Sequence, residues 1–230
     1  IGNMGGIVGY LDGDDVYVTG SANRGTVHSQ NIDNTDEILY TSQAANTGGV
    51  VGKINRNKIN DEDGNVLNNE AILAGIKDGS ITAAVTDSYN TGDVRGYSGV
   101  GGVIGMMYNG EVVGSYNQGD INTTRQPKGG DRTTVNMGGV VGDTTEESNA
   151  SAVLYNVYNS GQIGDETYTN YARHVGGVVG RLSGTVDKAY NTGAIYNGYS
   201  VVGGIAGWFY EGTISNAFNT GNITVNNKET

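Results

Sequence analysis

The sequence predicts an all-β fold, namely a parallel β-helix (β-solenoid) of about six coils with loop insertions. Two observations lead to this prediction. First, a Gly-Gly-apolar-apolar-Gly segment occurs six times, and every copy is followed by an Asn-x-Gly segment. Fixed self-similarity of this kind indicates a stacked repeat. Second, the apolar runs are short and are interrupted by Gly and Asn, which is typical of strands and turns rather than of helices.

The two halves of the unit recur in the same order along the chain. The glycine pairs begin at residues 5, 48, 101, 138, 176 and 203, and the Asn residues that follow them are Asn23, Asn90, Asn117, Asn159, Asn191 and Asn219. In the last and shortest copy we expect strands over residues 204–209, 213–218 and 222–225. Three short strands in about 27 residues form one solenoid coil, whereas a propeller blade needs about 40 residues.

Apolar side chains at equivalent positions form columns, which we expect to build one continuous core. The residue after each glycine pair is always β-branched, as in Ile7, Val50, Val103, Val140, Val178 and Ile205. Alternation would place Ile205, Gly207 and Phe209 on one inward side, where the glycine leaves room in a narrow coil or permits a bulge. The other columns are Leu11, Met107, Leu182 and Phe209; Val112, Val186 and Ile214; and Val94, Ile121, Ile163, Ile195 and Ile223.

The Asn-x-Gly segment predicts a corner, because Asn and Gly tolerate positive φ angles and tight turns. The Asn side chains should stack as a ladder in which each amide bonds to the coils above and below. An aromatic column precedes the ladder, formed by Tyr89, Tyr116, Tyr158, Tyr190 and Phe218. Because the column before the rings is small (Ser88, Ser115, Ala189 and Ala217), we expect the rings to pack inward rather than to serve as a ligand platform.

The glycine pairs are 43, 53, 37, 38 and 27 residues apart, and the excess over the shortest copy marks insertions. These fall near residues 29–46, 55–79, 122–136, 144–150 and 164–173, and a short helix is expected over residues 68–76. Because the repeat runs from end to end, residues 1–230 are expected to form a single solenoid domain. The chain begins inside a repeat without a signal peptide, which suggests a fragment of a longer protein.

The paired motifs Gly48-Gly49-Val50-Val51-Gly52 and Tyr89-Asn90-Thr91-Gly92 resemble the GLUG-motif repeats of bacterial surface proteins. Such repeats occur in large adhesins and in the non-catalytic regions of IgA-specific metallopeptidases. The similarity covers nearly the whole chain outside the insertions, although Ile or Val stands here where Leu is typical. The resemblance implies a β-helical fold and a cell-surface or secreted location. It carries over no functional residues, because the motif itself is structural.

Composition argues against several classes of protein. The net charge of −11 would repel nucleic-acid phosphates and anionic lipid, so we expect no nucleic-acid partner and no binding to a membrane surface. The chain has no cysteine, which excludes disulfides and thiolate chemistry. No apolar run approaches the roughly 20 residues that cross a bilayer, so no membrane insertion of this segment is expected.

No catalytic or metal-binding constellation emerges, so we expect no enzyme activity and no cofactor. The only histidines, His28 and His174, are far apart and do not form a zinc motif. We expect each of them to be a lone, exposed side chain. Residues 61–65 with Glu70 partly match a calcium loop, but Ile59 occupies the first ligand position. A second acidic turn at residues 12–15 lacks a complete ligand set. The acidic residues that recur, Asp93 and Asp120, are turn residues of the repeat and give no paired carboxylates for glycoside cleavage.

Outward-facing aromatic residues are the remaining candidate for ligand contact. By alternation, Trp208 and Tyr210 flank the inward Phe209, and Met106 and Tyr108 flank the inward Met107 in the same way. Together, Trp208, Tyr210, Tyr108 and Met106 could form a strip that binds a glycan or a protein. Equally, Trp208 could lie beneath a further coil or a partner domain.

These observations favour a bacterial cell-surface or secreted adhesin or stalk module, which displays loops that bind a host or matrix protein or a glycan and adjoins flanking domains of the same longer chain. One alternative is a non-catalytic accessory segment of a large secreted peptidase. A polysaccharide-degrading β-helix is a further alternative. A clustered trio of acidic and basic side chains on one outer face would favour the enzyme, and an aromatic strip without such a trio would favour the adhesin.

Overall fold

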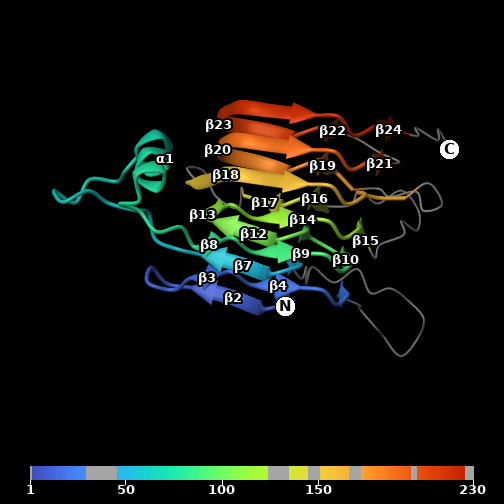
Figure 1. The fold of residues 1–230 in the computed structure, drawn as a ribbon, viewed down its shortest axis with the longest axis horizontal. Coiled ribbons are helices and arrows are strands. Elements are labelled where there is room, and N and C mark those ends of the chain that lie inside the picture. Colours follow the sequence, from blue (N-terminus) through green and yellow to red (C-terminus); the bar gives the residue numbers. More distant parts are fainter. Residues whose placement is uncertain are drawn as a thin grey trace.

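A computed structural model describes residues 2–29, 46–123, 135–144, 151–165, 172–197 and 201–225. Within them, the strands stack coil upon coil from the first glycine pair to the last (Figure 1). Strands of successive coils always pair in parallel, with equivalent residues of the repeat opposite one another; Gly101, for example, lies between Gly48 and Gly138. The prediction of an all-β parallel β-helix is therefore confirmed.

Each coil begins with a strand of a first sheet, which leads into the glycine pair. Its six strands are β1 (Met4–Gly5), β6 (Thr47–Gly48), β11 (Gly99–Gly101), β16 (Asn136–Gly138), β19 (His174–Gly176) and β22 (Val201–Gly203). The first glycine of each pair turns the chain tightly into the next sheet. A Cβ on Gly101 would lie 1.9 Å from the carbonyl oxygen of Ile104, so no larger residue fits there.

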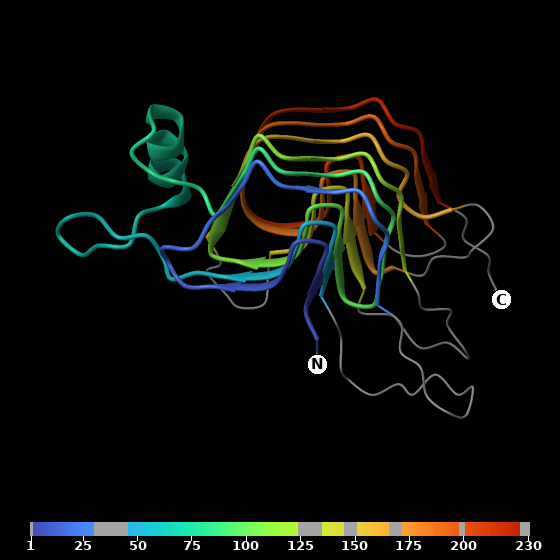
Figure 2. The ribbon, with the colours of Figure 1, turned by 60° about the horizontal axis from the view of Figure 1, so that its bottom comes forward.

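The second sheet folds back on itself and encloses the main core (Figure 2). Its first half holds β2 (Val8–Asp12), β7 (Val51–Asn55), β12 (Ile104–Tyr108) and β17 (Val141–Asp143). Its second half holds β3 (Val18–Thr19), β8 (Val85–Thr86), β13 (Gly110–Val113) and β18 (Ala152–Asn159), with β4 (Ala22–Asn23), β9 (Tyr89–Asn90) and β14 (Tyr116–Asn117) beyond a corner. In the last two coils, β20 (Val179–Asn191) and β23 (Ala206–Asn219) run through both halves.

The three separate strands expected for the last copy are only partly correct. Residues 206–219 form one strand, because the chain bends without losing its pairing to the coil below. The register shifts between Leu182 and Ser183, and Gly184 and Gly212 adopt φ angles of 143° and 114°. Glycine thus absorbs a bulge where the sequence suggested a turn.

A third set of strands closes each coil, formed by β5 (Val27–His28), β10 (Val94–Gly96), β15 (Ile121–Thr123), β21 (Ile195–Asn197) and β24 (Ile223–Val225). Isolated bridges through Ile163 connect β15 to β21. The predicted column from Val94 to Ile223 is confirmed by these pairings.

The interior consists of two apolar clusters rather than one continuous core, so that prediction is wrong. The larger cluster lies between the two halves of the second sheet and includes Val103, Met107, Val112 and Leu182. The smaller cluster lies between the first and third sheets and includes Val100, Ile121, Met137 and Ile195. All eight side chains are fully buried. Gly105 was expected to leave room inside a narrow coil or to permit a bulge. Glycine is instead required there by the first sheet, because a Cβ on Gly105 would lie 2.5 Å from the backbone nitrogen of Thr47.

The predicted ladder of asparagine side chains is confirmed. The Nδ2 atom of each Asn donates to Oδ1 of the Asn in the next coil, over 2.7–2.8 Å, from Asn23 through Asn90, Asn117, Asn159 and Asn191 to Asn219. Each Nδ2 also donates to the carbonyl oxygen of the glycine two residues later. The second glycine of each pair makes room for the ladder, since a Cβ on Gly49 would lie 2.4 Å from Cγ of Asn90. This contact explains why the two halves of the unit recur together.

The positive φ angles expected at the Asn-x-Gly corner occur three residues earlier instead. They belong to Gly20, Asp87, Gly114, Asn156, Lys188 and Asn216, with φ between 48° and 59°. The ladder residues Asn90 and Asn117 lie in extended strands. Asn is suited to this corner because its side-chain amide makes the ladder hydrogen bonds, and not because its backbone is left-handed.

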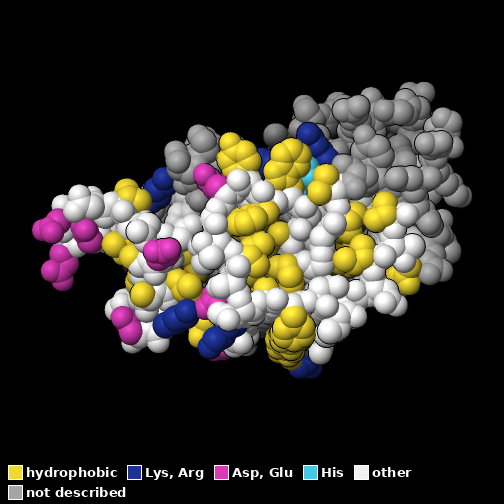
Figure 3. Space-filling view, turned by 90° about the horizontal axis from the view of Figure 1, so that it is seen from above, with side chains coloured by type: hydrophobic (Ala, Val, Ile, Leu, Met, Phe, Trp, Pro, Cys, Tyr) yellow, Lys and Arg dark blue, Asp and Glu magenta, His cyan; other side chains and the backbone are white. Residues whose placement is uncertain are grey.

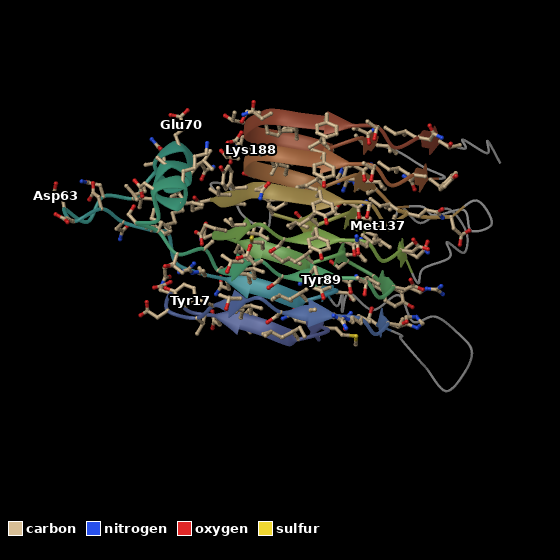
Figure 4. The ribbon with its side chains drawn as sticks, in the orientation of Figure 1. Tyr17, Asp63, Glu70, Tyr89, Met137 and Lys188 are labelled. Carbon is tan, nitrogen blue, oxygen red and sulfur yellow. The ribbon has the colours of Figure 1, made fainter. Side chains whose placement is uncertain are left out.

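The aromatic column stands on the outer surface, so the prediction that the rings pack inward is wrong (Figure 4, in which Tyr89 is labelled). Tyr89, Tyr116, Tyr158 and Tyr190 are half-buried, and Phe218 is 54% exposed. Neighbouring rings are parallel, with centroids 4.6–5.2 Å apart. The physical reason is alternation: Ser88 and Asn90 both point inward and are fully buried, so the residue between them must point outward.

The predicted helix is confirmed as α1 (Asn69–Asp78). Its boundaries follow from the sequence, because Asn68 caps the first turn by accepting a hydrogen bond from the Ala71 amide and Gly79 ends the helix at φ 83°. The helix belongs to an inserted arm, residues 56–84, that leaves the second coil and stands beside the solenoid (Figure 1).

Candidate functional site

Insertions enter the coil at only two edges. We call the junction between the third strands and the next first-sheet strand the loop edge; it lies between residues 29 and 46, 96 and 99, 123 and 136, 165 and 174, and 197 and 201. We call the junction between the two halves of the second sheet the arm edge; it lies between residues 12 and 18, 55 and 85, 108 and 110, and 143 and 152. Four of the five predicted insertions fall mostly on residues outside the described ranges, but all five have their attachment points at these edges.

The rest of the coil has the same length in every copy. The stretch from the core residue of the second half through the left-handed corner and the Asn to the third strand spans residues 18–27, 85–94, 112–121, 154–163, 186–195 and 214–223. We call it the ladder segment. Its stacked amides, rings and glycines must repeat at one axial spacing, so a longer copy would break the contacts with both neighbours.

The inserted arm is held against coils well above its own. The Nζ atom of Lys77 lies 2.6 Å from Oδ2 of Asp187 and 5.2 Å from the ring of Tyr155. A second bond, 2.6 Å long, joins Oγ of Ser151 to Oδ1 of Asn69. On the arm, Ile72 is 1% exposed. The helix therefore bridges the second coil to the fourth and fifth, and the arm keeps a fixed place relative to them.

Buried charges secure the base of the arm. The side chains of Arg56 and Glu111 are both buried, with Nη1 and Oε2 2.7 Å apart, and Arg56 also donates to the carbonyl oxygen of Asp14. Burial raises the pKa of Glu111, although Arg56 opposes the shift. Burial alone would also raise the pKa of Asp187, but hydrogen bonds from Lys77, Asn216 and Ser215 lower it to about 2. These groups explain the placement of the arm without any ligand.

The tip of the arm carries residues 61–65, the acidic turn that partly matches a calcium loop. Asp63 marks this tip, at the far left of Figure 4. The Oδ1 atom of Asp61 accepts hydrogen bonds from the backbone amides of Asp63 and Asn65, and these bonds, Asn65 foremost, lower the pKa of Asp61. In the second acidic turn, Asp14 accepts from the backbone and side chain of Asn57. Within the described ranges, no group of three His, Asp or Glu residues could hold a metal ion.

The four residues predicted to contact a ligand do not form one strip. Trp208 and Tyr210 lie in the sixth coil and are 39% and 65% exposed, whereas Met106 in the third coil is 7% exposed. Between Met106 and Trp208, the same column holds Asp143 and Arg181, whose charged groups are 3.8 Å apart. Tyr108, which is half-buried, receives Nζ of Lys53 at 4.7 Å from its ring centroid.

His174 has a structural role that the sequence does not predict. It is 2% exposed, so the expectation of an exposed histidine is wrong for His174, whereas His28 is exposed. The Nδ1 atom of His174 lies 2.7 Å from Oδ1 of Asn136, and its Nε2 atom has no hydrogen-bond partner. The His174 ring makes a T-shaped contact with Trp208 at 4.6 Å. Burial, with help from Arg173 and Arg181, lowers the pKa of His174 to about 4.

The aromatic column offers ring edges rather than ring faces. Because adjacent rings lie face to face within about van der Waals contact, a sugar could stack on a ring face only at the Phe218 end of the column. At the Tyr89 end, Arg24 donates from Nη2 to the hydroxyl of Tyr89 over 2.8 Å. The column therefore fits a role in holding coils together better than a role as a glycan platform.

No family model, no curated protein and no solved structure matches the chain. The resemblance of the repeats to the GLUG motif accordingly stays a prediction. None of the helices in the described part of the chain is long and apolar enough to span a membrane.

Proposed function

We propose that the chain is a non-enzymatic β-solenoid module of a bacterial cell-surface or secreted protein, which presents inserted segments to a host or matrix protein or a glycan. The surface or secreted location rests on the resemblance of the repeats alone. The mechanism is display: the ladder segments fix the coils, and the insertions supply the contacts.

One observation carries this proposal, namely the confinement of insertions to two edges. Attachment points of successive coils stack at the strand spacing of about 4.8 Å, so segments that are far apart in sequence leave the solenoid side by side. A composite surface can then form from several insertions on one rigid support. The inserted arm, which spans coils and is anchored by Lys77 and Asp187, is the described example of such a segment.

Three variants of the chain locate the contact surface. Coil two closes its loop edge with Tyr97 and Ser98 alone. The register of the flanking strands makes Ser29 and Asn46 equivalent to Gly96 and Gly99, so we replace the intervening residues 30–45 of the sequence with Tyr-Ser. The tip of the arm, which the bridge between Asn60 and Val66 closes, is replaced from residue 61 to 65 by Gly-Gly. Trp208→Ala tests the aromatic candidates.

The purified chain and its variants are assayed against an array of glycans and matrix proteins. We expect specific binding that falls at least tenfold in one of the three variants while circular dichroism and the melting temperature stay unchanged. Absence of binding to every member of the array would reject the hypothesis of an adhesin. The chain would then act as a spacer, as expected for an accessory segment of a peptidase. Cleavage of a polysaccharide in the same assay would instead support the enzyme.

A further inference from the structure

A row of four tyrosine side chains crosses the outer face of the ladder segments in coils two to five. The four residues share one position of the unit and lie one above another: Tyr89, Tyr116, Tyr158 and Tyr190. We call them the tyrosine row. Figure 3 looks along the solenoid axis, and a stack of apolar side chains projects there from the lower edge of the molecule. Each residue of the row has a further coil above and below it, so its exposure does not depend on either end of the chain.

The tyrosine row carries hydrogen-bond donors that the described protein does not use. The rings lie within 4° of parallel, with centroids 4.6–5.0 Å apart, so the ring faces are covered and the half-buried rings present their edges and hydroxyl groups. Arg24 donates to the hydroxyl of Tyr89, but no described residue bonds to the hydroxyls of Tyr116, Tyr158 and Tyr190. Because the edge of an aromatic ring is positive, the row suits a ligand that is rich in hydrogen-bond acceptors.

A second row of polar side chains runs beside the first. Two residues further along each strand, alternation places exposed side chains on the same outer face: Thr91, Gln118, Ser160 and Thr192. We call them the polar row. Two residues of a strand cover about 6.6 Å, and hydroxyl and amide groups of this kind can donate hydrogen bonds. The ladder segments therefore present two parallel rows of donors, which both run along the solenoid axis.

A chain in the polyproline II conformation has the period that these rows require. It has three residues per turn and rises about 3.1 Å per residue, so carbonyl groups on one side recur every 9.3 Å or about that. Two coils at about 4.8 Å each cover about 9.6 Å. The hydroxyls of Tyr116 and Tyr190, two coils apart, thus match carbonyl groups three residues apart. Because such a helix has no internal hydrogen bonds and proline has no N–H, a proline-rich ligand offers only acceptors to this surface of donors.

The charge of the ladder segments favours a basic ligand. Asp93 and Asp120 follow the polar row by two residues, and they are half-buried and exposed, respectively. The two basic residues of the ladder segments, Arg24 and Lys188, already donate to tyrosine hydroxyls. With the net charge of −11, these groups should attract Lys or Arg side chains of a ligand, most strongly at low salt.

We propose that the tyrosine row and the polar row bind a basic, proline-rich peptide segment in the polyproline II conformation, which lies along the solenoid axis. Tyr116 and Tyr190 donate to its carbonyl oxygens, and the polar row contacts a second side of the three-sided helix. Aromatic surfaces are a recurring means of recognising such segments. The four rings span three coil spacings, about 14 Å, which correspond to about five residues of the ligand. This surface is separate from the insertions, so the inference goes beyond the display function.

Fluorescence anisotropy of a labelled peptide tests the proposal. The probe has nine prolines between two lysines at each end, and the control peptide replaces the prolines with alternating Gly and Ser at the same length and charge. We expect saturable binding of the proline probe that is at least about tenfold tighter than that of the control, because the proline chain is already ordered. Shortening the run to three prolines, which is less than the length of the row, should weaken binding by a similar factor.

Phe substitutions separate ligand binding from the structural role of the rings, because Phe keeps the stacked ring and removes only the hydroxyl. Tyr116→Phe combined with Tyr190→Phe should raise Kd at least about tenfold through the loss of two hydrogen bonds, with an unchanged melting temperature. Tyr158→Phe removes the hydroxyl between the two contacted carbonyls and should change Kd by less than about threefold. Tyr97→Phe, at the loop edge, is the matched control and should bind as the unmodified chain does.

The proposal is overturned if the proline probe does not bind, or if the Gly-Ser control binds equally well, since charge alone would then explain the binding. Equal binding by the folded double Phe variant overturns it as well, and a loss confined to Tyr158→Phe contradicts the two-coil register. The variant with Tyr-Ser in place of residues 30–45 should bind the probe normally. These outcomes do not depend on the array of glycans and matrix proteins, so failure here leaves the display function to its own test.

Discussion

The ladder segment and the loop edge belong to the same six coils but differ in what they tolerate. The ladder segment has one length in every coil, whereas the loop edge is closed by two residues between Gly96 and Gly99 and by many more between residues 29 and 46. In the ladder segment, side-chain amides, rings and glycines touch their equivalents above and below. Coil-to-coil side-chain contact, rather than position along the backbone, therefore restricts insertion.

The largest expected effect is that of Gly119→Ala in the ladder segment. The new Cβ would lie 2.0 Å from the carbonyl oxygen of Gly92, which backbone atoms cannot relieve without separating two coils. We expect the free energy of unfolding to fall by about 3 kcal/mol or more, as measured by chemical denaturation at low protein concentration. Gly25→Ala is the matched control, with a change below about 0.5 kcal/mol. Equal losses in the two variants would contradict the role given to the coil below.

A slightly smaller effect is expected when the amide ladder is interrupted in the middle. Asn117→Ala leaves Nδ2 of Asn90 without one acceptor and Oδ1 of Asn159 without a donor, and both groups are fully buried. Since an unsatisfied buried group costs about 1–3 kcal/mol, we expect a total loss of about 3 kcal/mol. Asn23→Ala disturbs only one neighbour and should cost about half as much. An equal loss of stability at both positions would contradict the expectation that each Asn–Asn hydrogen bond of the ladder contributes separately.

The inserted arm should respond to acid, unlike the ladder. Because the pKa of Asp187 is lowered to about 2, its contribution is complete above the unfolded value of 3.8 and is lost as the pH falls toward 2. We expect hydrogen exchange of the α1 amides to rise in this range, and Asp187→Asn to show the raised exchange already at neutral pH. Unchanged α1 exchange in this variant would refute the anchoring role.

His174 adds a second acid-sensitive term at higher pH. Its folded pKa of about 4 lies below the ordinary value of 6.5, so the unfolded chain binds the proton first and stability falls as the pH drops from 6.5 to 4. The contact with Trp208, the only tryptophan, makes intrinsic fluorescence the convenient measurement. In His174→Asn the loss of stability between pH 6.5 and 4 should disappear.

The smallest effects are expected at the left-handed corner and at the loop edge. Lys188 adopts a φ of 56° at a position that other coils give to Gly, Asn or Asp, so Lys188→Gly should raise the free energy of unfolding by about 1 kcal/mol. A lower free energy of unfolding would mean that the bond from Lys188 to the Tyr155 hydroxyl outweighs the backbone strain.

Replacing residues 30–45 with Tyr-Ser should change the free energy of unfolding by less than about 1 kcal/mol, since the cost of loop closure depends weakly on loop length. A large loss there would erase the distinction between the two regions.

Much of this architecture could be predicted from the sequence because its contacts repeat. The Asn ladder, the apolar columns and α1 each follow from residues that recur or from Asn68 and Gly79 at the helix ends. The orientation of the rings was predicted wrongly because the small Ser88 column was assigned to the outside, whereas the buried amide of Asn90 fixes the alternation. The two separate clusters depend on the ladder lying between sheets, which no single copy of the unit reveals.

The candidate site was less predictable because it depends on unique rather than repeated residues. Trp208 is exposed in the sixth coil, whereas Met106 and Asp143, at the equivalent position of the third and fourth coils, are buried. Tyr210 is the extra residue at the register shift and has no equivalent in the coil below. The anchoring of the inserted arm by Lys77 and Asp187 joins residues 110 positions apart (187 − 77), and neither belongs to a motif. His174 gave no signal of burial, because its burial arises from Trp208 in the coil above.

The single direction of the amide ladder has a consequence for how the solenoid unfolds. Six amide dipoles point along one axis. Each polarises its neighbours, which strengthens each bond in such chains by about 10–30%. The middle rungs gain from both sides and the outer rungs from one. Melting should therefore proceed by fraying from both tips, and every added coil should raise the stability of coils that it does not touch.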